Sequence, residues 1–120
     1  MLQWLGAEGR RFLNTVIWSW QGWAAAWASE KTLRQWTLVQ AASVALACWL
    51  DIEPGERALI IGLGFVLLAA ELLNTAVEEA IDYLSLATDP RAKKAKDCGS
   101  AGVALAAIAG GAAWLVVLIG

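Results

Sequence analysis

The sequence predicts an all-α membrane protein in which an amphipathic surface helix precedes three transmembrane helices. Hydrophobic residues make up 59% of the 120 residues, and the mean hydropathy is +0.57. Soluble domains are only about 45–50% apolar. Three apolar segments follow a tryptophan-rich N-terminal region. Because the chain is too short for two domains, we expect residues 1–120 to form one membrane-embedded unit.

Residues 8–30 predict the surface helix. Apolar side chains recur there at spacings of three and four, which places them on one helical face; they are Phe12, Val16, Trp20, Trp23 and Trp27. Tryptophan is typical of the headgroup region of a membrane. The rest of the chain offers no soluble core on which such a helix could pack. We therefore expect it to lie in the membrane interface.

The three apolar segments predict transmembrane helices at about residues 33–50, 58–82 and 98–119. The first is the shortest, but Trp36 and Trp49 lie where aromatic anchors would mark its ends. The third is long enough to cross a hydrocarbon core of about 30 Å. Between the first two, the sequence DIEPGER combines Asp, Pro and Gly, which predicts a turn.

The basic residues predict the orientation in the membrane. Only Arg57 lies on one side of the predicted spans, and eight basic residues lie on the other: Arg10, Arg11, Lys31, Arg34, Arg91, Lys93, Lys94 and Lys96. Basic residues favour the cytoplasmic side. We expect the N-terminus and the loop at 83–98 to be cytoplasmic and the C-terminus to face the periplasm or exterior, in a three-span inner-membrane protein. The N-terminal segment does not have the pattern of a cleaved signal peptide.

The composition excludes several kinds of chemistry. The chain has no histidine, which excludes histidine acid–base catalysis and histidine metal sites. A net charge of −2 does not favour nucleic-acid binding. Cys48 and Cys98 are predicted to be buried free thiols. There is no P-loop sequence, and GLGF at residues 62–65 does not fit a dinucleotide-binding motif.

Four polar residues on one face of the second apolar segment are the strongest functional signal. They are Glu71, Asn74, Glu78 and Asp82, and their helical spacing places them within about 60° of one another. A charged side chain at the bilayer centre costs about 2.5–3.5 kcal/mol on insertion scales, so an intramembrane acid indicates function. The alternatives are a proton path and a polar packing contact between helices.

The depth of these acids suggests two roles. Glu71 follows a long apolar run, where burial disfavours the charged form of a carboxyl group, and this suits a general base that acts on an alcohol. Glu78 lies nearer the interface, where it can stay ionised and hold a hard cation through oxygen. Glu30, at the end of the surface helix, is a candidate second ligand for that cation.

The basic loop before the third span is a candidate phosphate site. Lys93 and Lys94 are expected to be interfacial anchors. Lys96 and Asp97 instead precede the small residues Gly99 and Ser100 at the start of the span. A lysine can act as a point charge on phosphate oxygens, and small residues let a ligand approach closely.

These segments resemble the signature of the prokaryotic diacylglycerol kinase family. ELLNTAVEEAID at residues 71–82, followed by RAKKAKDCGSAG at residues 91–102, is similar to E-x-x-N-[ST]-A-[IV]-E-x-x-x-D and then A-K-D-x-G-S-A. SWQGWAAAWASEKTLRQ and ACWLDIEPGER resemble two upstream segments of the family. The similarity covers about residues 10–115. It implies a homotrimeric membrane enzyme that transfers the γ-phosphoryl group of MgATP to the primary hydroxyl of diacylglycerol, giving phosphatidic acid.

The resemblance also implies roles for individual residues. Glu71 is the catalytic base, and Glu30 and Glu78 hold Mg²⁺. The residues expected around ATP are Arg11, Trp18, Glu30, Asn74, Glu78, Ala87, Thr88, Asp89, Lys96 and Asp97. The residues expected around the lipid are Arg11, Trp20, Trp27, Arg34, Trp49, Arg57, Glu71, Ser100 and Trp114.

Three positions depart from the family pattern. Trp36 stands where a glutamate is common, Trp18 where a tyrosine is usual, and Thr88-Asp89 replaces a Tyr-His pair. The sequence is also similar to the undecaprenol kinases, which tend to carry alanine at Gly99-Ser100, so undecaprenol is the alternative acceptor. A small proton-coupled exporter and a structural membrane adaptor are the alternatives from other functional classes.

Overall fold

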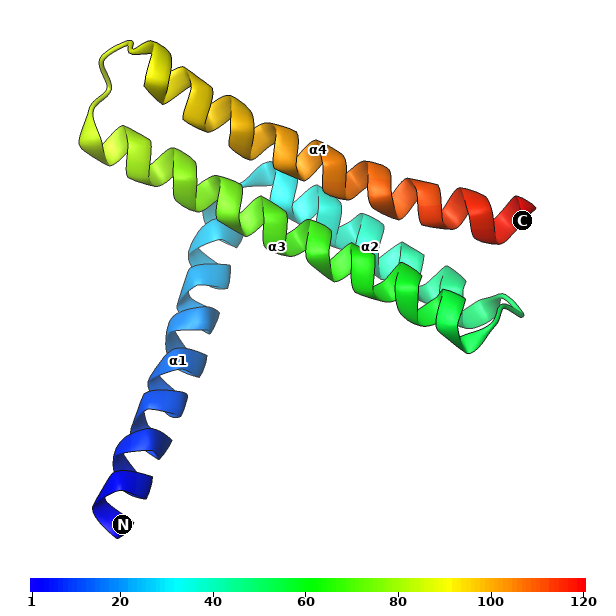
Figure 1. The fold of residues 1–120 in the computed structure, drawn as a ribbon, viewed down its shortest axis with the longest axis horizontal. Helices are drawn as coiled ribbons and strands as arrows, with labels where there is room; N and C mark the ends of the chain where they lie inside the picture. The colour runs from blue at the N-terminus through cyan, green and yellow to red at the C-terminus, as the bar shows by residue number, and fades with distance from the viewer.

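The computed structural model describes residues 1–120 as four helices: α1 (Leu2–Ser29), α2 (Lys31–Trp49), α3 (Pro54–Leu84) and α4 (Pro90–Ile119). Figure 1 shows α2, α3 and α4 running side by side, while α1 leads away from them at a steep angle. The prediction of an all-α protein is confirmed. Each helix begins earlier than the sequence predicted, and the residues added to α2, α3 and α4 are mostly polar.

Local sequence explains where α3 and α4 begin. Pro54 occupies the first helical position of α3, and the Glu53 backbone N–H donates to the Glu56 carboxylate at 3.2 Å in a capping box. At the start of α4, Asp89 accepts from the Arg91 backbone N–H at 2.7 Å. Both arrangements satisfy N–H groups that a helix leaves unpaired at its start. The turn predicted in DIEPGER is therefore confirmed.

Two of the helices, α3 and α4, are long and apolar enough to cross a membrane. They have 31 and 30 residues, and at 1.5 Å per residue each is about 45 Å long, which exceeds a hydrocarbon core of about 30 Å. Part of each helix can therefore extend beyond the bilayer core. The α2 helix has 19 residues and begins with a polar turn, so its apolar part is shorter than those of α3 and α4. A third crossing by α2 stays a prediction.

The surface of the single chain is strongly apolar. Only 9 of 120 residues are buried, and large hydrophobic side chains are exposed on all four helices. Such a surface requires contact with lipid or with other protein chains. Cys48 and Cys98 are free but exposed, so the prediction that both are buried is wrong. Each lies on a side of its helix that no other part of this chain covers.

The α3 helix lies between α2 and α4. The side chain of Gln40 on α2 is buried and donates to the Ile61 carbonyl oxygen of α3 at 3.1 Å. Gly64 lies directly against that amide, and a Cβ atom at this position would overlap the Gln40 side chain. The α4 helix makes no close backbone approach to α2, but the Trp114 indole N–H donates to Ser43 Oγ at 2.8 Å. Polar contacts thus join α2 to both neighbours.

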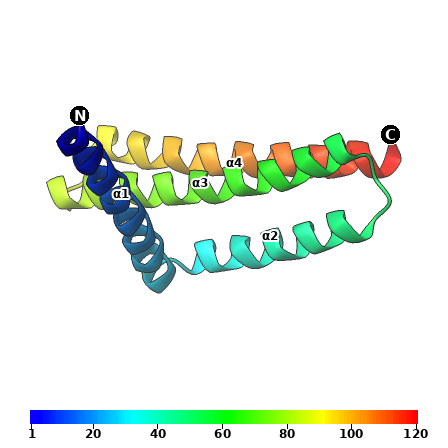
Figure 2. The same cartoon turned by 90° about the horizontal axis from the view of Figure 1, so that it is seen from below.

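The two ends of the bundle differ in what they carry. Figure 2 shows α1 crossing the end at which α3 turns into α4, whereas the C-terminus lies at the other end, beside the turn from α2 to α3. The basic residues of the 91–96 segment therefore lie at the same end as α1. This is the arrangement that the predicted membrane topology requires.

Candidate functional site

Acidic residues from two parts of the chain line one cavity beside α3. Glu30 lies at the junction of α1 and α2, and Glu71 and Glu78 lie on α3. The cavity has a volume of about 460 Å³ and is lined by Glu30, Thr32, Trp36, Glu71, Asn74, Thr75, Glu78, Ser100, Val103 and Ala104. We call it the carboxylate pocket. The structure thus brings Glu30 and Ser100 to the polar face of α3.

The two α3 acids differ in depth. They are seven residues apart, or about 10 Å along the helix axis, and both face the carboxylate pocket. Glu71 lies on the apolar side and is only 5% exposed. Glu78 lies two turns nearer the 85–89 loop and is half-buried. The pocket therefore has an enclosed acid at one end and a more accessible one at the other.

Asn74 lies between these acids and is positioned by α4. Its Nδ2 donates to Glu78 Oε1 at 3.3 Å, and its Oδ1 is buried without a hydrogen-bond partner. Gly99 of α4 lies against this oxygen, and a Cβ atom there would overlap it. The absence of a side chain at Gly99 therefore gives the Asn74 amide the space to lie where it can reach Glu78.

A second cavity follows the carboxylate pocket along the contact between α3 and α4. Asp82 comes one turn after Glu78 on α3, and Lys96 comes one turn before Ser100 on α4. This cavity, which we call the loop pocket, has a volume of about 280 Å³, and the predicted nucleotide-binding residues among those that line it are Ala87, Thr88, Asp89, Lys96 and Asp97. The two groups of predicted residues thus occupy adjacent cavities.

The lysines of the loop pocket are paired with acids. Lys96 Nζ lies 2.6 Å from Asp82 Oδ1, which joins α4 to α3, and Lys93 pairs with Asp97 one turn along α4. All four side chains are at least 39% exposed, and exposed ion pairs contribute only about 0–1 kcal/mol. These lysines can therefore exchange a carboxylate for another anion at little cost.

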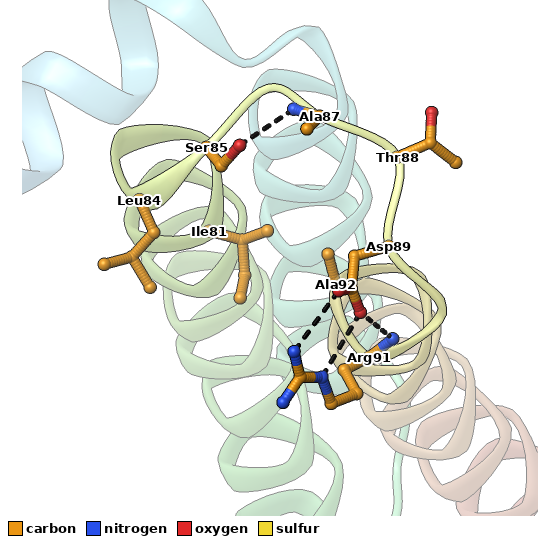
Figure 3. A pocket seen from close by; sticks show the side chains of 8 residues that line it. All are labelled: Ile81, Leu84, Ser85, Ala87, Thr88, Asp89, Arg91 and Ala92. Atoms are coloured by element: carbon orange, nitrogen blue, oxygen red, sulfur yellow. Dashed lines mark hydrogen bonds and ion pairs between the residues drawn. The ribbon is translucent and has the colours of Figure 1, made fainter.

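The loop between α3 and α4 ends on Asp89. The Arg91 side chain, with its Nε 3.3 Å from Asp89 Oδ1, and the Arg91 backbone N–H both donate to this carboxylate. These hydrogen bonds hold the pKa of Asp89 below its ordinary value. Figure 3 shows these contacts together with the Ala87 N–H, which donates to Ser85 Oγ at 3.0 Å. Asp89 is therefore ionised at neutral pH and caps α4.

The predicted site residues of α1 lie outside both pockets of this chain. Arg11 is exposed and pairs with an acid one turn before it at 3.1 Å. Trp18 and Trp20 are exposed, and Trp27 stacks on Trp23 with ring centroids 5.9 Å apart. Contacts of the predicted α1 residues with nucleotide or lipid stay predictions.

Four more predicted lipid contacts also lie outside the two pockets. Arg34 donates to the Trp27 carbonyl oxygen. Arg57 donates to three carbonyl oxygens at and after the end of α2, at 2.8 to 3.3 Å, which satisfies a helix end. Trp49 is 82% exposed near that same end, and Trp114 lines a separate apolar groove. Arg57 lies 14 residues before Glu71, or about 21 Å along α3.

Five residues that line the carboxylate pocket were not among the predicted site residues: Thr32, Trp36, Thr75, Val103 and Ala104. Thr75 Oγ1 donates to the Glu71 carbonyl oxygen at 3.1 Å, and its place one turn after Glu71 was a usable signal. Thr32 lies in the first turn of α2, directly after the break between helices at Glu30. Trp36 was predicted to be an aromatic anchor and was noted as a departure from the family pattern, and it lines the carboxylate pocket.

Known proteins with similar sequences identify the family. The family model for prokaryotic diacylglycerol kinase matches residues 17–118. A diacylglycerol kinase of Pseudomonas aeruginosa is 38% identical over 111 residues, which are 92% of this chain and 90% of the relative. One of Escherichia coli is 33% identical over 108 residues, 90% of this chain and 88% of the relative.

A more distant match extends the same result. A diacylglycerol kinase of Helicobacter pylori is 33% identical over 91 residues, 76% of this chain and 71% of the relative. The match to the family model includes both the polar stripe of α3 and the start of α4, which carried the resemblance in the sequence. The chain belongs to the prokaryotic diacylglycerol kinase family.

Proposed function

We propose that this protein transfers the γ-phosphoryl group of ATP to the primary hydroxyl of diacylglycerol, giving phosphatidic acid. Family membership supports a kinase activity, and the relatives from Pseudomonas aeruginosa and Escherichia coli are named diacylglycerol kinases. The observation that carries the proposal is the carboxylate pocket, which combines a buried acid with two further acids next to a lysine-containing cavity.

The proposed setting is the bacterial inner membrane, with α1 in the cytoplasmic interface and three crossings by α2, α3 and α4. The basic residues support a cytoplasmic N-terminus and a periplasmic C-terminus. A homotrimer would cover part of the exposed apolar surface. Because Arg11 and Trp18 lie away from the pockets of their own chain, a trimer would also let them approach the site of a neighbouring subunit.

Glu30 and Glu78 have the chemistry of a Mg²⁺ site. Both line the carboxylate pocket and offer hard oxygen ligands. The structure has no cluster of three acidic, cysteine or histidine side chains that would enclose an ion. In nucleotide enzymes, Mg²⁺ usually takes one or two carboxylates and completes its shell with water and phosphate oxygens. When bound, it supplies positive charge that stabilises the phosphate oxygens during transfer.

In the proposed reaction, Glu71 accepts the proton of the lipid hydroxyl. The hydroxyl oxygen forms a bond to the γ-phosphorus, the bond from that phosphorus to the bridging oxygen breaks, and ADP leaves. Val103 and Ala104 line the same pocket and give it an apolar side. Lys96 would exchange Asp82 for phosphate oxygens. Asn74 holds Glu78 in place through its amide.

The proposed acceptor is tested with labelled ATP. We expect the purified protein in detergent micelles to transfer the γ-phosphoryl label to diacylglycerol with a higher kcat/KM than to undecaprenol, and to stop when Mg²⁺ is chelated. A preference for undecaprenol would overturn the proposed acceptor. Labelling of neither lipid would overturn the kinase assignment, and proton flux in vesicles would then indicate an exporter.

Gly99→Ala is expected to lower kcat although glycine contributes no chemical group. The added methyl would displace the Asn74 amide and break its hydrogen bond to Glu78. A hydrogen bond to a charged group contributes about 1.5–3 kcal/mol, so we expect a loss of about 10- to 100-fold. The measurement is the initial rate of diacylglycerol phosphorylation.

Gly102→Ala is the matched control for this prediction. A Cβ atom at Gly102, on the same helix, meets no atom within 4 Å. We expect this variant to retain the wild-type rate. Equal losses in the two variants would mean that the effect arises from a general change in α4 and not from the Asn74 contact.

A further inference from the structure

An apolar groove borders the carboxylate pocket, and Trp36 lines both cavities. The groove has a volume of about 200 Å³ and is formed by α2, α3 and α4. Small residues contribute to its wall, among them Gly64, Gly110 and Gly111. Trp114 also lines it and bridges to Ser43 of α2. The groove therefore shares Trp36 with the carboxylate pocket and lies between helices that are proposed to cross the bilayer.

Trp36 is held firmly at the boundary between the two cavities. It packs against a cluster formed by Ala26, Leu33 and Leu68, which joins it to α1, α2 and α3. It lines the carboxylate pocket together with Glu71. An indole is large, has few rotamers and only donates hydrogen bonds. Trp36 thus forms one wall of the groove and lines the same pocket as the residue proposed as the base.

We propose that Trp36 determines which lipid alcohols the enzyme accepts. Its indole narrows the passage from the carboxylate pocket into the groove, so that an acceptor places its hydroxyl beside Glu71 and a slender, unbranched acyl chain beyond Trp36. An alcohol whose chain carries methyl branches close to the hydroxyl does not pass. This inference rests on the proposed lipid kinase activity and concerns the choice of acceptor.

The size of the groove supports part of one chain as its occupant. Pockets that enclose drug-sized ligands have volumes of about 300–1,000 Å³, and the groove, at about 200 Å³, is smaller. It cannot hold a whole lipid. In its lining, Gln40 Nε2 donates to the Ile61 carbonyl oxygen and Ser43 Oγ accepts from Trp114. The other lining residues are apolar or glycine, which suits hydrocarbon.

The experiment compares acceptors in variants of Trp36. The ratio of kcat/KM for undecaprenol, a branched alcohol, to that for dioleoylglycerol is measured in the same micelles. Hydrophobic pockets discriminate by about 10- to 200-fold, so we expect Trp36→Ala to raise this ratio at least about tenfold. Trp36→Phe keeps a flat wall and should retain the wild-type ratio. An unchanged ratio in Trp36→Ala would overturn the proposal.

Leu38→Ala is the matched control. Leu38 lies on α2 two residues from Trp36, is 70% exposed and lines neither cavity. This variant should leave both the ratio and the individual constants unchanged. If Trp36→Ala and Trp36→Phe lower kcat equally for both acceptors, Trp36 only supports the fold, and the proposal is wrong.

A binding measurement separates this inference from the proposed reaction. A short-chain diacylglycerol with a bromine atom on one acyl chain is added to bromine-free micelles, and quenching of tryptophan fluorescence is recorded without ATP. We expect part of the quenching to disappear in Trp36→Phe and to persist in Leu38→Ala. Equal quenching in all three proteins would overturn the inference. Selective quenching without phosphorylation would instead overturn the proposed kinase activity alone.

Discussion

Replacing Glu71 by glutamine is expected to lower kcat for diacylglycerol phosphorylation by about 10²- to 10⁴-fold, the range that general acid–base catalysis contributes. An amide of the same size cannot accept the hydroxyl proton. The protein should stay folded, because the side chain is only 5% exposed and a neutral amide at this depth is easier to bury than a carboxylate.

Glu79→Gln is the control for this substitution. Glu79 is on the same helix, is exposed and lies outside the carboxylate pocket. We expect this variant to keep the wild-type rate, and both variants to elute from size exclusion like the wild type. Turnover by a folded Glu71→Gln protein at the rate of Glu79→Gln would remove Glu71 from the role of base.

Glu78→Ala is expected to raise the Mg²⁺ concentration needed for half-maximal activity by at least about tenfold, equivalent to losing roughly 1.4 kcal/mol of binding. The carboxylate is one of two proposed ligands in the pocket. Removing it also frees the Asn74 amide, which donates to it at 3.3 Å. The measurement is initial rate against free Mg²⁺ at saturating ATP and lipid.

Two further variants help to interpret this Mg²⁺ titration. Glu30→Ala should also raise the Mg²⁺ concentration needed for half-maximal activity, since both acids face the same cavity. Glu79→Ala removes an adjacent acid outside that cavity and should leave this Mg²⁺ concentration unchanged. If Glu78→Ala has the Mg²⁺ dependence of the wild type, Glu78 is not a ligand. If only kcat falls, its role is to hold Asn74.

The sequence was sufficient for the features that depend on neighbouring residues. Helical periodicity placed Glu71, Asn74 and Glu78 on one face, and all three line the carboxylate pocket. The turn before α3 followed from Pro54 and the residues around it. The burial of Cys48 was predicted wrongly. In a segment that is apolar on all sides, the sequence does not show which face another helix covers.

The remaining features depend on how separate helices meet. The overlap of Asn74 with any side chain at Gly99, the pairing of Lys96 with Asp82, and the position of Trp36 beside two cavities all join residues of different helices or cavities. Helix crossings and side-chain volumes decide such contacts.

The sequence by itself therefore determined the helical class, the polar face of α3 and the family. Each of these depends on the spacing of residues that are close in the sequence, because a helix repeats every 3.6 residues wherever it lies. Only the tertiary structure decided that Glu30 joins the α3 acids and that Trp36 separates their pocket from an apolar groove. Those contacts arise because close packing selects one arrangement of helices whose order along the chain permits several.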